Sequence, residues 1–273
     1  MSYGAESWIE EACVAYLEEL GWNVRYGPDL APGEAGAERS TYADVVLTGR
    51  LRAAVKRLNP RLPAAAVDDA VATVLRAESQ NLLAENWRVH RLIVEGVPVQ
   101  YRRGDAIVDD QAWLIDWKTP RHNDWLAVNQ FTVVEHRRNR RPDVVVFVNG
   151  LPLGLIELKN PGDENATLKG AFNQLQTYKS EIPTLFAPNA VVVVSDGVGA
   201  KMSTMSAPWE HFAPWKTIDG ERLADTGLPE LEVLVRGVFE RERFLDLVRN
   251  FIVFSDETSG LVKRVAKYHQ FWA

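Results

Sequence analysis

The feature that most constrains this chain is a pair of apolar runs joined by a short turn, between Arg140 and Asn160. Val144 to Val148 forms the first run, Asn149-Gly150 follows, and Leu151 to Ile156 forms the second. Asn-Gly between apolar runs is a strong short-range signal for a β-hairpin, because both residues tolerate the positive φ angles of a tight turn. The sequence therefore predicts a buried hairpin that supplies two neighbouring strands of a sheet.

Charged residues gather at the open end of this hairpin. Asp143 precedes the first strand, while Glu157 and Lys159 end the second. Residues two apart in a strand share a face, so Glu157 and Lys159 point the same way, Leu158 points the other way, and the hairpin returns Asp143 towards Glu157. Unpaired charges beside apolar strands are costly unless something compensates them, and a divalent cation can do so. The spacing Asp-x13-Glu-x-Lys is that of a Mg²⁺-dependent phosphodiesterase site, and the alternative is an ordinary strand end with solvated charges.

A magnesium site gives each of these residues a role. Mg²⁺ prefers oxygen ligands and keeps several waters. It polarises a phosphoryl oxygen and lowers the pKa of a bound water. We expect Asp143 and Glu157 to be direct ligands, with the backbone carbonyl of Leu158 as a third. Lys159 would orient or deprotonate the attacking water, or offset charge in the transition state.

Two helices offer supporting residues. Glu10, on the predicted N-terminal helix, is the candidate for an additional metal-binding acid, and Glu6, one turn earlier, is the alternative. Gln174 and Tyr178 lie one turn apart on a helix that follows the Lys159 strand, so they would hold a phosphate or order Lys159. The competing interpretation is that these are polar faces of ordinary surface helices.

A basic segment directly before Asp143 is the candidate DNA-binding surface. It contains Arg137, Arg138, Arg140 and Arg141, and Lys118 would extend it. Arginine and lysine side chains contact the phosphate backbone of nucleic acids. The alternative is a solvated loop.

The totals exclude several classes of protein. A single cysteine among 273 residues rules out an internal disulfide framework and fits a reducing cytoplasm. No apolar run approaches the roughly 20 residues needed to span a membrane, so no membrane association is expected. A formal net charge of -6 argues against coating nucleic acid by bulk charge. The P-loop pattern is absent, so ATP binding of that kind is not encoded here.

Hydrophobic periodicity predicts helices and strands in mixed order, which indicates an α/β (or α+β) fold with a central mixed sheet flanked by helices and a helical insert near residues 45–95. The predicted helices cover Glu6 to Leu20, Val45 to Leu58, Ala64 to Arg76, Gln80 to Val94 and Thr167 to Ile182, with two more, broken near Arg241, over Leu228 to Asn250. Besides the hairpin, the predicted strands cover Trp22 to Tyr26, Val97 to Tyr101, Gln111 to Trp117, Leu126 to Glu135, Ala190 to Val194 and Lys201 to Met205. Gly162 to Asn165 is predicted as a polar loop.

Three segments resemble a known family. They are LLAENWRVHRLIVEGVPVQY, NQFTVVEHRRNRRPDVVVFVNGLPLGLIELKNP and AFNQLQTYKSEIPTLFAPNAVVVVSDG. The chain is similar to the N-terminal nuclease domain of the R (restriction and motor) subunit, HsdR, of type I restriction endonucleases. The likeness runs from the Glu10 helix to about Phe254 and is weakest between Pro28 and Ser40.

The resemblance implies a PD-(D/E)xK fold and Mg²⁺-dependent endonuclease activity on duplex DNA. It carries over Asp143, Glu157 and Lys159 as catalytic residues and Gln174 and Tyr178 as the family's Q-x-x-x-Y motif. The two other readings are a non-catalytic docking or coupling module of the restriction complex, and a stand-alone repair or modification-dependent nuclease.

The resemblance also predicts the surroundings of the domain. Residues 1–255 would form the endonuclease domain, and residues 256–273 a linker and the opening helix of an absent ATP-driven motor domain, from Leu261 onward. The chain would then be a fragment that ends before the P-loop. Its partners would be the methylation (M) and specificity (S) subunits, which choose the DNA sequence.

Overall fold

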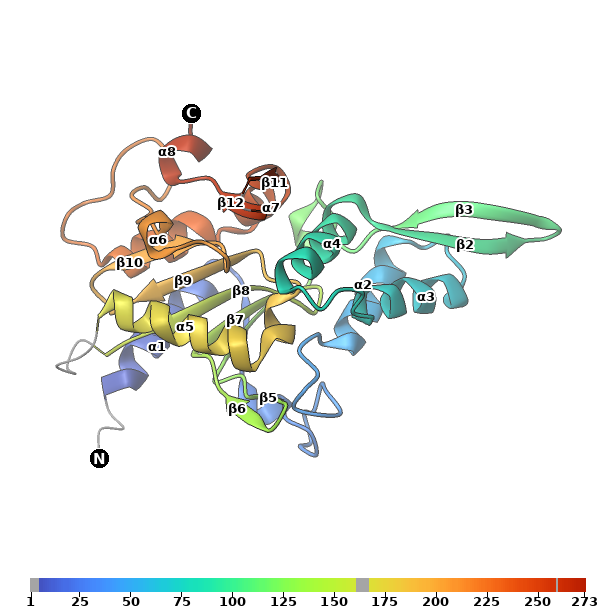
Figure 1. The fold of residues 1–273 in the computed structure, drawn as a ribbon, viewed down its shortest axis with the longest axis horizontal. Coiled ribbons are helices and arrows are strands. Elements are labelled where there is room, and N and C mark those ends of the chain that lie inside the picture. The colour runs from blue at the N-terminus through green and yellow to red at the C-terminus, as the bar shows by residue number, and fades with distance from the viewer. Residues whose placement is uncertain (1–4, 161–166, 259) are drawn as a thin grey trace.

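A six-stranded mixed sheet lies at the centre of the molecule (Figure 1). The computed structural model describes residues 5–160, 167–258 and 260–273, so the polar loop predicted at residues 162–165 lies outside the described part. In spatial order the strands are β1 (Asn23–Tyr26), β4 (Trp125–Asn129), β7 (Val144–Val148), β8 (Leu151–Leu158), β9 (Val191–Ser195) and β10 (Ala200–Ser203). The β1–β4 and β8–β9 pairs are parallel and the other three are antiparallel.

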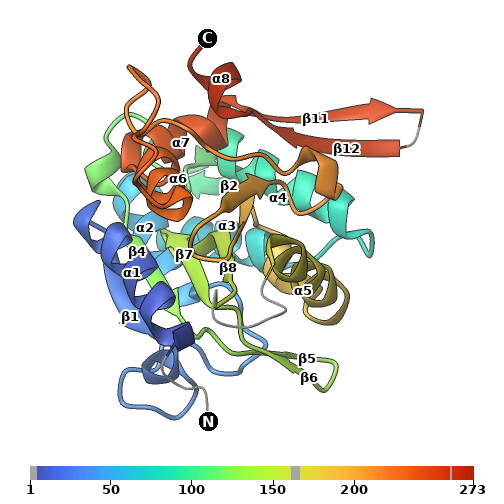
Figure 2. The ribbon, with the colours of Figure 1, turned by 90° about the vertical axis from the view of Figure 1, so that its left-hand side faces the viewer.

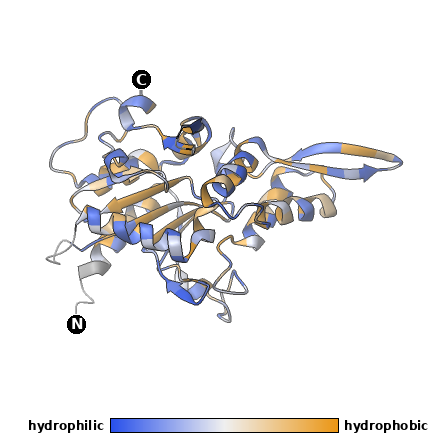
Figure 3. Ribbon diagram, in the orientation of Figure 1, coloured by the Kyte–Doolittle hydropathy of each residue, from blue (hydrophilic) through white to orange (hydrophobic). Residues whose placement is uncertain are grey.

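Helices cover both faces of this sheet (Figure 2). Helix α1 (Ala5–Glu19) lies on one face beside α6 (Glu230–Val238), and α5 (Leu168–Glu181) lies on the other. Every residue of β7, β8 and β9 is buried, and these strands form the hydrophobic centre of the ribbon (Figure 3). A sheet buried on both faces reads as continuous apolar runs. The predicted central mixed sheet flanked by helices is therefore confirmed.

The predicted hairpin is formed by β7 and β8. Asn149 and Gly150 have φ angles of 52° and 82°, as a two-residue turn with both central residues left-handed requires. The register then shifts: Val146 pairs with Gly154, whereas Phe147 pairs with Pro152. Leu153 is thus an extra residue in β8, a β-bulge. Proline and glycine inside a strand both favour such a bulge, since proline has no N–H to donate and glycine has no side chain to pack.

The side chain of Asn149 ties the hairpin turn to its surroundings. Its oxygen accepts the N–H of Asp124 at 2.7 Å, and its amide donates to the carbonyl of Leu114 and to Asn123, both at 2.8 Å. The N–H of Leu47, just before helix α2 (Thr48–Leu58), donates to the carbonyl of Gly150 at 2.9 Å. The turn is therefore held by chain segments on both sides of the helical insert.

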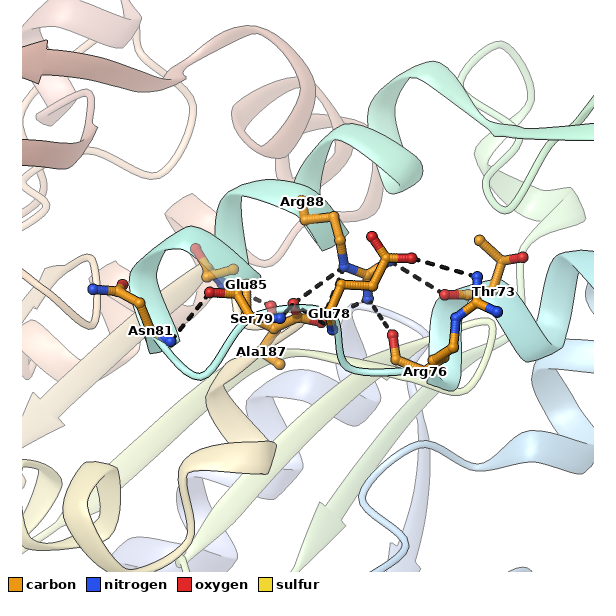
Figure 4. A network of polar contacts seen from close by, with 9 residues as sticks. Thr73, Arg76, Glu78, Ser79, Asn81, Glu85, Arg88 and Ala187 are labelled. Atoms are coloured by element: carbon orange, nitrogen blue, oxygen red, sulfur yellow. Dashed lines mark hydrogen bonds and ion pairs between the residues drawn. The ribbon is translucent and has the colours of Figure 1, made fainter.

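The helical insert is confirmed as three helices, α2 (Thr48–Leu58), α3 (Ala64–Leu75) and α4 (Leu82–Glu95). A polar network at the α3–α4 connection holds it together (Figure 4). Glu85 Oε2 accepts the backbone N–H groups of Glu78 and Ser79 at 3.1 and 3.0 Å, and Oε1 accepts Arg88 at 2.6 Å. Arg88 also donates to the carbonyl of Arg76 at 2.8 Å. The Asn81 side chain accepts from Ala84 and caps α4.

Two strand predictions are wrong in extent. The strand expected over Gln111 to Trp117 lies earlier, because β2 (Val97–Arg103) pairs with β3 (Ala106–Ala112) in a projecting hairpin. Most β3 side chains are exposed, so the apolar alternation that marks a half-buried strand is missing. The strand expected over Leu126 to Glu135 is divided into β4 and β5 (Val133–Glu135), because Gln130 has a φ of 56° and turns the chain.

The C-terminal helix expected from Leu261 is also wrong over its first part. Residues there form an antiparallel hairpin of β11 (Ile252–Glu257) and β12 (Gly260–Val265), and only α8 (Tyr268–Phe271) is helical. Lys263, 1% exposed, donates to the Asn189 carbonyl at 2.6 Å. Burial lowers the pKa of Lys263 to about 7. The buried amine fixes the hairpin at the start of β9.

The remaining elements are short. They are α7 (Arg241–Asn250), β6 (Arg138–Arg140) and four 3₁₀ helices, η1 (Gly27–Leu30), η2 (Pro120–His122), η3 (Pro183–Phe186) and η4 (Trp209–His211). Among the described helices, none combines the length and the apolar composition that a bilayer crossing demands.

Replacing Glu85 with glutamine should destabilise the insert. The substitution keeps the shape of the side chain but removes the negative charge of the carboxylate that accepts hydrogen bonds from Arg88 and from two backbone N–H groups. We expect this to lower the unfolding free energy by about 1.5–3 kcal/mol. Although burial acts to raise the pKa of Glu85, these hydrogen bonds hold it below its usual value. The stabilisation is therefore present above the unfolded pKa and is lost as the pH falls through the folded pKa. Urea unfolding at several pH values measures both effects.

The matched control is Glu95→Gln. Glu95 pairs with Arg91 on the same helix, but these side chains are 57% and 58% exposed. Exposed pairs contribute at most about 1 kcal/mol. Equal losses from both variants would contradict the importance of the buried network.

Candidate active site

The predicted acids and lysine meet where β7 begins and β8 ends. Val144 pairs with Ile156, so Asp143 and Glu157 stand opposite each other one position further along. A regular two-residue hairpin would have placed Ile156 there. The Leu153 bulge advances β8 by one residue and brings Glu157 opposite Asp143 instead. The Asp143 carboxylate accepts the Leu158 N–H at 2.7 Å, which ties the two strand ends together.

Glu157 is a fully buried carboxylate. Its Oε1 atom accepts the Tyr178 hydroxyl and the Lys159 ammonium, both at 3.4 Å, whereas Oε2 is buried and has no hydrogen-bond partner among the described residues. Burial raises the pKa of Glu157 well above its ordinary value, and the Asp143 charge raises it further against the opposing effect of Lys159. When Glu157 is ionised, the charge on its Oε2 atom is therefore offset by no hydrogen bond from the described residues.

Four side chains form a closed ring of hydrogen bonds around this acid. Lys159 donates to the Gln174 side-chain oxygen, and Gln174 donates its amide to the Tyr178 hydroxyl at 2.6 Å. Tyr178 donates to Glu157, which also accepts from Lys159. Burial, then the charge of Glu157, raises the pKa of Tyr178, so this hydroxyl stays protonated and donating. The structure thus brings Gln174 and Tyr178 to Lys159, as the helix spacing predicts.

A small cleft of about 110 Å³ opens beside this ring. Its lining residues are Ile9, Glu10, Gln130, Arg141, Asp143, Leu158, Lys159 and Asn160. Asp143 and Lys159 reach the cleft directly, and Glu157 lies beneath them with none of its surface exposed. A phosphate entering the cleft would therefore meet Arg141, Lys159 and Asp143.

Glu10 lies in the same cleft, but its carboxylate already has partners. It accepts the side-chain amides of Asn129, at 2.6 Å, and Gln130. Within the described residues, no three or more His, Cys, Asp or Glu side chains gather closely enough to hold a metal ion. Glu10 therefore does not complete a three-acid set in this structure, and its role as a metal ligand stays a prediction. Glu6 lies on α1, but its side chain falls outside the described part.

The arginine segment is divided among different positions. It forms a second hairpin, β5–β6, whose turn residues His136 and Arg137 have φ angles of 47° and 66°. Arg140 and Arg138 face Glu181 of α5, so only Arg141 lines the cleft. Lys118 lies elsewhere: it precedes Asp124, whose carbonyl bonds to the turn residue Asn149 at the opposite end of the sheet. Because β7 rises about 3.3 Å per residue, that end is roughly 20 Å from Asp143, and Lys118 does not extend the arginine segment.

Some residues that contact the acids were not predicted from the sequence. Asn129 ends the apolar strand β4 and Gln130 follows it, and this polar pair is a sequence signal that the strand ends at a site. The Gln130 N–H donates to the Asp143 carbonyl at 2.9 Å. Cys13 of α1 is fully buried, and burial, then the charges of Asp143 and Glu10, raises the pKa of its thiol. It therefore packs as an apolar residue beneath the acids.

The donor set fits a divalent cation. Mg²⁺ in phosphoryl-transfer sites is commonly held by one or two carboxylates together with substrate phosphates. Two carboxylates stand opposite each other here, and one of their oxygens is buried and without a partner among the described residues. A cation near Oε2 would lower the free energy of the ionised Glu157 that burial now disfavours.

The fold and the site together describe a mixed α/β domain with an acid–acid–lysine set at one end of its central hairpin. Residues 5–211 match the family described as type I restriction enzyme R protein N terminus. The chain belongs to this family.

Named relatives agree with this assignment. The chain is 38% identical over 272 residues to the type I restriction enzyme HindI endonuclease subunit of Haemophilus influenzae, covering 98% of this chain and 26% of the relative. It is 28% identical over 283 residues to a Methanocaldococcus jannaschii protein named for the type I restriction enzyme MjaIXP endonuclease subunit, with coverages of 97% and 26%. The chain thus spans about a quarter of the length of these relatives.

Replacing Glu157 with glutamine should stabilise the metal-free protein. An acid whose folded pKa is raised keeps its proton to a higher pH in the folded state than in the unfolded state. The contribution of Glu157 to stability therefore falls as the pH rises from the unfolded pKa through the folded one, by up to about 1.4 kcal/mol per pH unit. Other buried groups, such as Lys263, contribute in the opposite direction. Thermal unfolding in a chelator between pH 5 and 8 should therefore show the stability of Glu157→Gln, relative to the parent chain, increasing with pH.

Glu11→Gln, which changes an exposed acid of helix α1, is the control and should keep the pH profile of the parent chain. A Glu157→Gln variant with the same profile as the parent would show that the buried carboxylate is compensated.

Proposed function

We propose that this chain is the DNA-cleaving part of a type I restriction enzyme R subunit, a Mg²⁺-dependent endonuclease domain with a PD-(D/E)xK fold. The observation that carries the proposal is the buried Glu157 carboxylate opposite Asp143, with Lys159 held beside Glu157 in a hydrogen-bonded ring that includes Gln174 and Tyr178. Membership of the R-protein family and the names of the relatives support the same reaction.

The residues divide the work as follows. Asp143, Glu157 and the Leu158 carbonyl would hold the metal ion; an extended residue directs its N–H and C=O to the same neighbour, and the Leu158 N–H already faces Asp143. When bound, Mg²⁺ supplies positive charge that polarises a phosphoryl oxygen and makes a nearby water more acidic.

Lys159 is positioned to act on the charge that develops during hydrolysis. Its ammonium is fixed by Gln174 and Glu157 yet lines the cleft, so it can donate to a phosphate oxygen or to the attacking water without first reorganising. Arg141, on the other side of the cleft, would bind the phosphate of the strand that is cut.

The remainder of the full-length subunit would contribute the steps that this domain lacks. We propose that an ATP-driven translocase follows in the longer protein, and that methylation and specificity subunits select the DNA sequence. On this basis, the 273-residue chain alone should cleave duplex DNA only slowly, because the proposed translocase would be what delivers the substrate.

Nicking of supercoiled plasmid DNA, with Mg²⁺ or Mn²⁺ and excess protein, tests the proposal. Asp143→Asn, Glu157→Gln and Lys159→Ala should each reduce cleavage by about 100-fold or more, the usual cost of losing one transition-state contact or metal ligand. Lys56→Ala, which removes an exposed lysine of the insert, should leave the rate unchanged. Cleavage by Lys159→Ala at the parent rate would overturn the assignment.

Calorimetry with Mn²⁺ separates this function from the docking alternative. A nuclease should bind Mn²⁺ through Glu157, so Glu157→Gln should lose the binding, and binding by the parent chain should strengthen as the pH rises and the carboxylate ionises. A docking or coupling module would show no binding that depends on Glu157. A stand-alone nuclease would instead cut rapidly at low protein concentration without partners.

A further inference from the structure

Two lysines converge on one tryptophan beside the site. Lys169 lies in the first turn of α5, Lys201 lies on β10 and Trp209 begins η4. The ammonium of Lys169 is 5.0 Å from the centroid of the Trp209 ring, and that of Lys201 is 4.7 Å from it. Trp209 in turn packs edge-on against Phe172 at 5.5 Å, which fixes the ring on the sheet. We call Lys169, Lys201 and Trp209 the lysine–tryptophan patch.

Strand register places this patch level with the proposed catalytic acid. Glu157 pairs with Val194, and Val194 pairs with Lys201. Directly paired residues point to the same face of a sheet, so Lys201 shares the α5 face with Glu157. Two strand spacings of about 4.8 Å separate their backbones by about 10 Å. The patch therefore flanks the cleft on the β9–β10 side, opposite the β5–β6 arginines.

Among the residues that the structure describes, no acid pairs with the charges of this patch. Within the described residues, neither Lys169 nor Lys201 forms an ion pair, and both ammonium groups lie over aromatic faces. Such contacts contribute only about 0.5–1 kcal/mol at exposed sites. No acid occupies the first turn of α5, where a lysine is electrostatically unfavourable. In a chain of net charge -6, two adjacent uncompensated cations beside the cleft form a local positive surface.

We propose that the lysine–tryptophan patch binds the phosphate backbone of the duplex whose scissile phosphate lies in the cleft. The inference rests on the proposed nuclease function and identifies a substrate contact outside the acid–acid–lysine set. A DNA strand carries one phosphate per 3.4 Å of helix axis, so a separation of about 10 Å corresponds to a phosphate about three nucleotides from the cut. The lysines bind charge and not bases, so the contact is independent of sequence.

Fluorescence anisotropy with a short labelled duplex, in a chelator so that no cleavage occurs, tests the patch. The double variant Lys169→Ala/Lys201→Ala should bind about tenfold more weakly or worse at 50 mM salt. It should also reduce the slope of log affinity against log salt concentration by about 1–2, since each phosphate contact contributes about 0.9. Lys169→Arg/Lys201→Arg should restore both quantities, which separates charge from a folding defect.

The matched control is Lys56→Ala/Arg61→Ala. It removes the same charge from exposed positions of the helical insert, and its affinity and salt slope should stay those of the parent chain. Parent-like affinity and slope in the lysine double variant would overturn the proposal, as would an equal loss in the control, which would show that only net charge matters.

These results are independent of the test of the proposed function. If Lys159→Ala abolishes nicking while the lysine double variant binds DNA normally, the patch inference fails and the nuclease function stands. If binding depends on the patch but the parent chain neither nicks DNA nor binds Mn²⁺ through Glu157, the nuclease function fails and a DNA-docking role remains.

Discussion

One extra residue in one strand determines whether this site exists. The turn at Asn149-Gly150 creates the hairpin, but its regular continuation would set Ile156 opposite Asp143 and direct Glu157 to the other face. Leu153, between Pro152 and Gly154, changes that phase. A methyl group at Gly154 would lie 2.5 Å from Val146 and 3.1 Å from Phe239, so the glycine also permits the close approach of β7 and of the segment after α6. The bulge thus converts an apolar hairpin into one whose two acids meet.

The arrangement of the two acids lowers the stability of the protein when no cation is bound. A carboxylate with no exposed surface and a raised pKa weakens the fold whenever it is ionised. The ring of Lys159, Gln174 and Tyr178 offsets part of that cost and fixes the lysine in one position. Unbalanced charge of this kind concentrates at functional sites, where a ligand completes the balance.

Much of the fold could be predicted from the sequence, for reasons that particular residues illustrate. The runs Val144 to Val148 and Leu151 to Ile156 are buried on both faces, so their composition alone marks them as strands. The helices of the insert and the pair Gln174–Tyr178 follow from helical periodicity. By contrast, β3 stands in solvent and has no apolar alternation, and β12 is held by a buried lysine that reads as a surface residue.

The site was predictable in its residues but not in its partners. Nothing in the local pattern shows that Arg138 and Arg140 are engaged by Glu181, or that Lys118 lies at the far end of the sheet, because these are contacts between distant segments. The bulge itself left a readable trace, since a proline and a glycine within one central strand both indicate an irregularity. The sequence alone does not predict in which direction this irregularity shifts the register between β7 and β8.

The contacts of the Asn149-Gly150 turn give the helical insert a structural role. A glycine at position 149 would preserve the bend and the backbone bond to the Asp124 carbonyl, yet lose the side-chain bonds to Asp124, Leu114 and Asn123. The Gly150 carbonyl would still accept the Leu47 N–H. Leu47, at the start of the insert, therefore helps to hold the turn of the hairpin, at the end of the sheet remote from the acids. A shortened domain without the insert would lose the Leu47 contact to the hairpin turn. The insert, although it contributes no residue to the cleft, therefore helps to keep the two acids in register.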